Sequence, residues 1–218
     1  MSELMDREPI HVELERARST LHDLASRASA ADLRRRTTGT RWTNEQMLFH
    51  MVFGYMIVLR LLWLVRFFGR LPDPYSRRFA KALNAARRPF HAVNYLGSCG
   101  GALVFHGPRL ESEAERVIAA LHRHLDRETE TSLTRRMHFP VDWDPFFRDS
   151  MTLLDVYHYG TEHFDFHTRQ LTLNPSTPRR STVVQSGRRW HPRMRTTRGL
   201  AADRRERGCT REDRVLLP

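Results

Sequence analysis

A long apolar segment from Met47 to Phe68 constrains the fold of this chain more than any other feature. Thr43 and Gln46 stand just before it with the spacing of a capping box, in which two side chains and two backbone N–H groups bond reciprocally at a helix start. We therefore expect a helix that begins after Thr43 and ends at about Phe68, where Gly69 follows. Because the segment is apolar on almost every side, this helix should lie at the centre of the core.

The same segment is not expected to cross a membrane. It contains His50, Arg60 and Arg66, and its longest uncharged part is shorter than the roughly 20 residues that a membrane span requires. The first residues of the chain are acidic and lack the apolar stretch of a signal peptide. Cys99 and Cys209 are the only cysteines, so neither a disulfide framework nor a paired-cysteine zinc motif is predicted. These observations favour a protein of the reducing cytoplasm with no membrane partner.

Three further segments show the periodicity of amphipathic helices. They are residues 10–28, Glu111 to Ser132, and Asp149 to Leu173. Residues 70–109 form a long connection, with a short helix before Pro89 and a turn-rich segment at 94–102. Residues 137–147 are expected to form a second irregular segment. Because no convincing strand pattern is present, the sequence predicts an all-α fold.

The charge of the chain is unevenly distributed. It carries 36 basic and 25 acidic side chains, a formal net charge of +11, which raises nucleic acid as a partner. Residues 175–218 contain twelve arginines and four acidic residues, a net charge of +8, which leaves only +3 for residues 1–174. The second part also lacks hydrophobic periodicity, so we expect a folded domain at 1–174 and a disordered tail at 175–218. Nucleic-acid contact through the tail is an alternative function, although no folded binding motif accompanies the charge.

Two histidines near the end of the last predicted helix have the spacing of metal ligands. Four residues turn an α-helix by about 400°, so the rings of His163 and His167 project within about 40° of each other. The protease version of this motif has a glutamate directly after the first histidine, and Phe164 at that position excludes the protease class. The alternative is that these histidines are hydrogen-bonded core residues.

His50 is the best candidate for a third ligand. It lies about 10 Å after the cap of its helix, and the histidine pair lies about 8–15 Å before the end of the last helix. If the two helices are antiparallel, all three rings lie at the same level of the fold. Three protein ligands leave a further coordination position open, as catalytic metal sites do.

Two segments, RWTNEQMLFHMVFGY and YHYGTEHFDFHTRQL, together resemble the DinB superfamily. Members show a Trp-Thr or Trp-Ser pair that leads into a helix with one histidine, and a last helix with HxxxH followed by Gln-Leu. The matching positions here are Trp42, Thr43, His50, His163, His167, Gln170 and Leu171. The resemblance covers nearly all of residues 10–174 and leaves the tail without a counterpart.

The resemblance implies a four-helix bundle with a long crossover between its second and third helices, which agrees with the long connection at 70–109. It also implies a divalent metal ion, zinc or nickel, held by the three histidines. Side chains near these ligands in the sequence are candidates for the groups that orient them. They are Tyr157, Glu162 and Asp165.

The resemblance extends to a chemistry, because relatives include thiol S-transferases and isomerases that use bacillithiol or mycothiol. Lys81 is the only lysine among the basic residues, which indicates a GC-rich source and favours mycothiol. The metal would make the thiol a nucleophile for an electrophilic small molecule. A non-enzymatic metal-binding or stress-response bundle would have the same ligands. The apolar residues of the first predicted helix, at 10–28, have a coiled-coil-like spacing, which would permit a homodimer.

Overall fold

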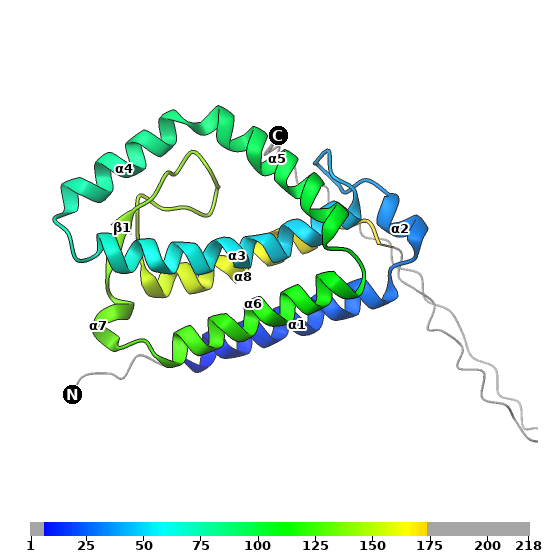
Figure 1. Cartoon of the computed structure of the whole chain (residues 1–218), viewed down its shortest axis with the longest axis horizontal. Coiled ribbons are helices and arrows are strands. Elements are labelled where there is room, and N and C mark those ends of the chain that lie inside the picture. Colours follow the sequence, from blue (N-terminus) through cyan, green and yellow to red (C-terminus); the bar gives the residue numbers. More distant parts are fainter. Residues whose placement is uncertain (1–6, 174–218) are drawn as a thin grey trace, which may run out of the picture.

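The computed structural model describes residues 7–173, and most of them are helical. The elements in chain order are α1 Glu8–Arg27, α2 Ala30–Arg34, α3 Asn44–Phe68, α4 Asp73–Ala85, α5 Arg87–Val104, α6 Pro108–Asp126, α7 Glu130–Leu133, β1 Arg136–His138, β2 Ser150–Thr152 and α8 Leu153–Thr168. The four long helices α1, α3, α6 and α8 form a bundle, which confirms the predicted all-α fold (Figure 1). The tail predicted to be disordered, residues 175–218, lies outside the described residues.

The bundle consists of two pairs of neighbouring helices, α3 with α8 and α1 with α6 (Figure 1). α3 and α8 are antiparallel, because Gly54 lies against His163 whereas Tyr55, one residue further along α3, lies against the earlier Gly160 of α8. The predicted crossover is formed by α4 and α5, which make an arch from the end of α3 to the start of α6. The arch places a fifth long helix, α5, beside the first half of α3.

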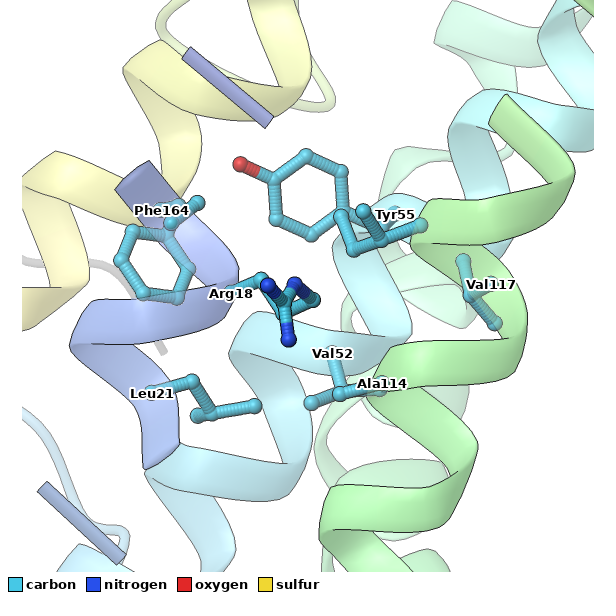
Figure 2. Close-up of a pocket in the computed structure, with 9 residues that line it drawn as sticks. Arg18, Leu21, Val52, Tyr55, Ala114, Val117 and Phe164 are labelled. Carbon is cyan, nitrogen blue, oxygen red and sulfur yellow. The ribbon is translucent and has the colours of Figure 1, made fainter. Parts of the chain in front are cut away.

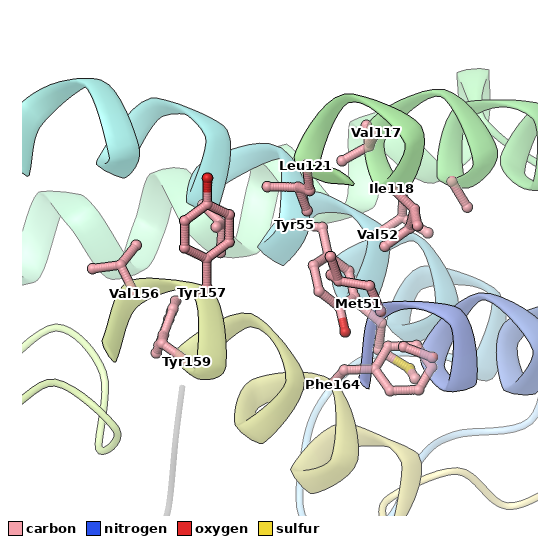
Figure 3. Packing of buried hydrophobic residues seen from close by; sticks show 14 of the residues in the cluster. Met51, Val52, Tyr55, Val117, Ile118, Leu121, Val156, Tyr157, Tyr159 and Phe164 are labelled. Carbon is pink, nitrogen blue, oxygen red and sulfur yellow. The ribbon is translucent and has the colours of Figure 1, made fainter. Parts of the chain in front are cut away.

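α3 is the central helix, as its apolar sequence predicts. Its start has the predicted capping box: the backbone N–H of Thr43 donates to Gln46 Oε1 at 2.9 Å, and the N–H of Gln46 donates to Thr43 Oγ1. Its side chains meet those of α6 and α8, and Figure 3 shows Val52 and Tyr55 among this cluster. α3 has the length and composition of a membrane span, but 56% of its most apolar window is buried inside the bundle. Its hydrophobicity is therefore explained by its place in the core.

The turn predicted at residues 94–102 is wrong, because these residues belong to α5. Pro89 lies in the first turn of α5, where a missing N–H costs no helical hydrogen bond, so the chain breaks only at Ala86. Glycine favours turns over helices, but Gly101 permits close packing of α5 on α3. A Cβ at that position would lie 2.1 Å from Cε1 of Phe49. Tertiary contacts therefore override the local turn signal.

The segment before α8 also differs from the expectation. β1 and β2 form an antiparallel pair in which Met137 lies opposite Met151. Strands of three residues are too short to show the alternation by which a strand is recognised. α8 begins at Leu153 rather than at Asp149, because Thr152 and Asp155 form a capping box at its start. The loop at residues 139–149 joins the two strands and carries a residue of the site described below.

Candidate metal centre

The antiparallel pair α3 and α8 brings three buried histidines together. His50 comes from α3, and His163 and His167 come from one face of α8. One nitrogen of each ring lies within 4.8 Å of a nitrogen of both others. Two nitrogens bound to one ion at about 2.1 Å lie at most about 4.2 Å apart, so small ring rotations would allow a shared ion. The three rings therefore lie at one level of the bundle, as the helix spacing predicts.

Hydrogen bonds fix the orientation of two of these rings. Nδ1 of His167 lies 2.7 Å from Gln170 Oε1, so it is Nδ1–H that donates to this oxygen. Nδ1 of His50 lies 3.0 Å from Ser98 Oγ on α5, which can accept its proton. In each ring the other nitrogen, Nε2, then keeps its lone pair for a metal ion. A metal-binding histidine is commonly held through its second nitrogen in this way.

The third ring, that of His163, is held by packing. A Cβ at position 54 would lie 2.7 Å from His163 Nδ1, so only glycine at this position of α3 leaves room for the ring. Nδ1 itself is buried and has no hydrogen-bond partner. Among residues 7–173, four buried side-chain nitrogen or oxygen atoms lack a partner, and two of them, His163 Nδ1 and Trp42 Nε1, belong to this cluster. The ring of Trp42 packs against that of His50 at a centroid distance of 4.4 Å, with the two planes tilted by 32°.

All three rings are neutral at pH 7. Burial lowers the pKa of His163 to about 4. Burial, assisted by the charge of His163, lowers the pKa of His167 to about 3. Burial also lowers the pKa of His50 well below its usual range. A neutral imidazole is the form that binds metal, so an ion would not have to displace protons from these ligands at pH 7.

A carboxylate that the sequence does not single out lies beside the histidines. Oδ2 of Asp144, in the loop between β1 and β2, lies 3.9 Å from His163 Nε2. Tyr159 on α8 donates its hydroxyl hydrogen to the same Oδ2 at 3.0 Å, and the N–H of Phe146 donates to Oδ1 at 2.9 Å. The sequence spacing could not have indicated Asp144, because this residue lies in an irregular loop, where no helical periodicity predicts the direction of a side chain.

The side chains predicted to orient the ligands have other partners. Asp165 forms a two-point ion pair with Arg16 of α1, with distances of 2.9 and 2.7 Å. Glu162 is exposed. Tyr157 lies beside Arg66 and Glu128 at the other end of α3. Asp165 and Glu162 lie on other faces of α8 than His163, because successive residues of a helix are separated by about 100°.

A small apolar pocket lies between α1, α3, α6 and α8, lined by side chains that include Leu21, Val52, Tyr55 and Phe164 (Figure 2). Arg18 is the only charged side chain in its lining, and none of the three histidines contributes to it. The pocket therefore provides no donor set for a cation, and the histidine cluster is the better candidate for chemistry.

Four-helix bundles with inward-facing ligands on facing helices form a recurrent class of metal-binding proteins, and the arrangement of α3 and α8 has this form. The family model of the DinB superfamily matches residues 13–171, so the chain belongs to the DinB superfamily. The matched region includes all three histidines. No curated protein and no solved structure matched the chain. Family membership thus supports the fold and a divalent-metal site, whereas the reaction must be argued from the site.

Proposed function

We propose that this protein binds one divalent metal ion, zinc or nickel, through His50, His163 and His167. The observation that carries the proposal is the convergence of three buried, neutral imidazoles on one point between two helices. A satisfied core histidine would use both ring nitrogens in hydrogen bonds, whereas residues 7–173 provide partners for only two of the six nitrogens in these rings, Nδ1 of His50 and Nδ1 of His167. The set of three nitrogen ligands suits either ion.

The residues around the histidines would prepare the site for this ion. Gln170 and Ser98 hold two rings in the tautomer that leaves Nε2 free, and Gly54 lets the third ring approach the backbone of α3. Trp42 covers the ring of His50 and shields it from water. This preorganisation would be lost if any of the three rings were free to turn.

We further propose that the protein is a thiol S-transferase or isomerase that uses a low-molecular-weight thiol such as mycothiol, in the cytoplasm. A divalent ion with an open position stabilises the thiolate of a coordinated thiol and so supplies a nucleophile at neutral pH. Support for this comes from the family and from the limited donor set, since three histidines leave positions for a cosubstrate. The second substrate would be a small electrophile.

A metal assay on four variants tests the site. The wild-type chain is expected to retain one ion per chain after dialysis, and His50→Ala, His163→Ala and His167→Ala should each lose it. His158→Ala is a matched control, because His158 lies on the same helix but pairs with Glu13 of α1 at 3.0 Å. Stoichiometric metal in all of these variants would overturn the proposed site.

A thiol-consumption assay separates the enzyme from the alternative, a non-enzymatic metal-binding or stress-response bundle. Loss of mycothiol is followed with a panel of alkylating and isomerisable electrophiles, using metal-loaded and metal-free protein. The enzyme proposal predicts turnover only with the metal-loaded wild type and the His158→Ala control. Metal binding without turnover of any thiol would favour the non-enzymatic bundle.

A further inference from the structure

The outer face of α5, a helix that lies outside the four-helix bundle, is apolar and exposed (Figure 1). The exposed fractions are 69%, 65%, 80% and 52% for Val93, Leu96, Leu103 and Val104. The backbone at Gly100, among these side chains, is also open, because a Cβ there would meet no atom within 4 Å. Single apolar residues are usual on protein surfaces, whereas a contiguous apolar patch on one helix face indicates a place of contact.

The spacing along this face is that of a helix that packs against another helix. Steps of three, four and three residues, as between the a and d positions of a coiled coil, separate Val93, Leu96, Gly100 and Leu103. A glycine inside a helix costs about 1 kcal/mol relative to alanine. The contact with Phe49 explains the glycine at 101, but nothing among residues 7–173 packs against Gly100. A second helix that approaches α5 closely from outside would explain it.

The order of residues along α5 makes this face complementary to itself. Val93 and Leu103 are equally far from residue 98, and so are Leu96 and Gly100. Two antiparallel α5 helices that cross at this level would therefore place Leu96 over the partner's Gly100, and two-fold symmetry would repeat the contact. A parallel pair would instead leave a gap at Gly100, where two glycines would face each other. The face thus fits a second copy of the chain.

The distribution of charge also favours a second copy over a charged partner. Neither acidic residues nor lysine or arginine occur between Arg88 and Arg109, so no like charges would meet along the apolar face. The arginines at its two ends, Arg87, Arg88 and Arg109, are exposed, and their long side chains can extend into water. Salt screens the repulsion between them, so a dimer through α5 should become tighter as the salt concentration rises.

The coiled-coil-like stripe of α1 is already used inside the bundle, where Ile10, Leu14, Ala17 and Leu21 are buried. α5 has 18 residues and is therefore about 27 Å long. One pair of such helices forms a small interface, below about 1,200 Å² in total. Interfaces of this size are typical of weak dimers, so we expect a dissociation constant on the order of micromolar.

We propose that the outer face of α5 is a homodimer interface, in which two copies pack antiparallel about a two-fold axis at the level of residue 98. Ser98 itself lies on the opposite, buried side of α5 and bonds to the ring of His50. The dimer would thus support from outside the helix that holds this ring. The interface does not require a metal ion, because its residues all lie on the outer face of α5.

Sedimentation equilibrium of the full-length protein over a range of concentrations tests the dimer. The average mass is expected to rise from that of one chain toward that of two. Leu96→Arg should raise the dissociation constant by at least about tenfold, because it places an unpaired charge in the apolar contact. Gly100→Leu should do the same by filling the space for the partner's Leu96. Val12→Arg is the matched control, since Val12 is an exposed apolar residue of α1.

A mixture of two variants tests the antiparallel orientation. Leu96→Arg and Gly100→Asp should each dimerise poorly alone, whereas their mixture should form a heterodimer in which the new arginine faces the new aspartate. Circular dichroism checks that each variant folds. A wild-type chain that stays monomeric, a dimer that Leu96→Arg weakens no more than Val12→Arg does, or a dimer that added salt dissociates would overturn the interface. A mixture that stays monomeric would overturn its antiparallel arrangement.

Discussion

Polar side chains are buried at both ends of the α3–α8 pair, and the two ends differ in how these side chains are satisfied. At the far end, about 24 Å along α3 from His50, Glu128 forms an ion pair with Arg66 and accepts a hydrogen bond from Ser132. At the histidine end, three neutral rings surround one point, and within residues 7–173 no arginine or lysine pairs with Asp144. The far end thus contains its own counter-charge, whereas at the histidine end the proposed metal ion would supply the positive charge.

The largest expected effect is at the far end. Glu128→Gln leaves Arg66 largely buried without its carboxylate, so we expect a loss of about 3 kcal/mol in the free energy of unfolding. Urea unfolding of the metal-free protein measures this. Asp144→Asn, which removes a buried charge without a partner, should leave the same quantity unchanged or slightly increased. A larger loss in the free energy of unfolding for Asp144→Asn than for Glu128→Gln would contradict this comparison of the two ends.

The histidine end should make the metal-free protein sensitive to acid. The pKa of His163 is about 4 in the folded chain and about 6.5 when unfolded, so between these values the unfolded chain binds more protons. The free energy of unfolding is then at its maximum above pH 6.5 and falls as the pH drops toward 4, by up to about 1.4 kcal/mol per pH unit for each such histidine. Urea unfolding at several pH values tests this, and His163→Asn should reduce the slope. An equal slope in the variant would show that His163 is not responsible.

The bonds that orient the rings should affect metal affinity more than folding. Gln170→Leu and Ser98→Ala each remove the partner of a ligand's second nitrogen, and we expect each to weaken metal binding by about 10- to 100-fold. Competition with a chromophoric chelator measures the affinity, and circular dichroism checks the fold. Unchanged affinity in both variants would mean that the rings are held by packing alone.

The smallest expected effect compares two helical glycines. Gly97 on α5 has open space around it, so Gly97→Ala should raise the free energy of unfolding by about 1 kcal/mol through helix propensity. Gly54→Ala should not give this gain, because its Cβ would displace the ring of His163, and it should weaken metal binding. An equal gain in the free energy of unfolding in both variants, with unchanged metal affinity, would show that the ring of His163 can move without loss of stability.

The bundle could be predicted from the sequence because its signals are local. Thr43 and Gln46 mark the start of α3 correctly, and helical spacing places His163 and His167 on one face. α5 was missed because its glycines indicate turns, and only the contact of Gly101 with Phe49 explains why they are helical. β1 and β2 were missed because each has only three residues.

The site was predictable only where helix geometry determines direction. The three histidines lie together because two helices are antiparallel and the rings occur at matching levels. Asp144 depends on a loop that is anchored through Trp143, and no periodicity leads to it. Asp165 was chosen for its closeness to His163 in sequence, but two residues along a helix point to nearly opposite sides, and Arg16 binds it there.

A titration of the metal-free chain with zinc or nickel tests the central claim most directly. We predict saturation at one ion per chain and a rise of about 2.7 kcal/mol in the free energy of unfolding when the free ion is at 100 times its Kd. The same titration of a chain with His50, His163 and His167 all replaced by alanine should show neither effect. Equal binding and stabilisation in that variant, or none in the wild type, would contradict the assignment of this end of the bundle as a metal centre.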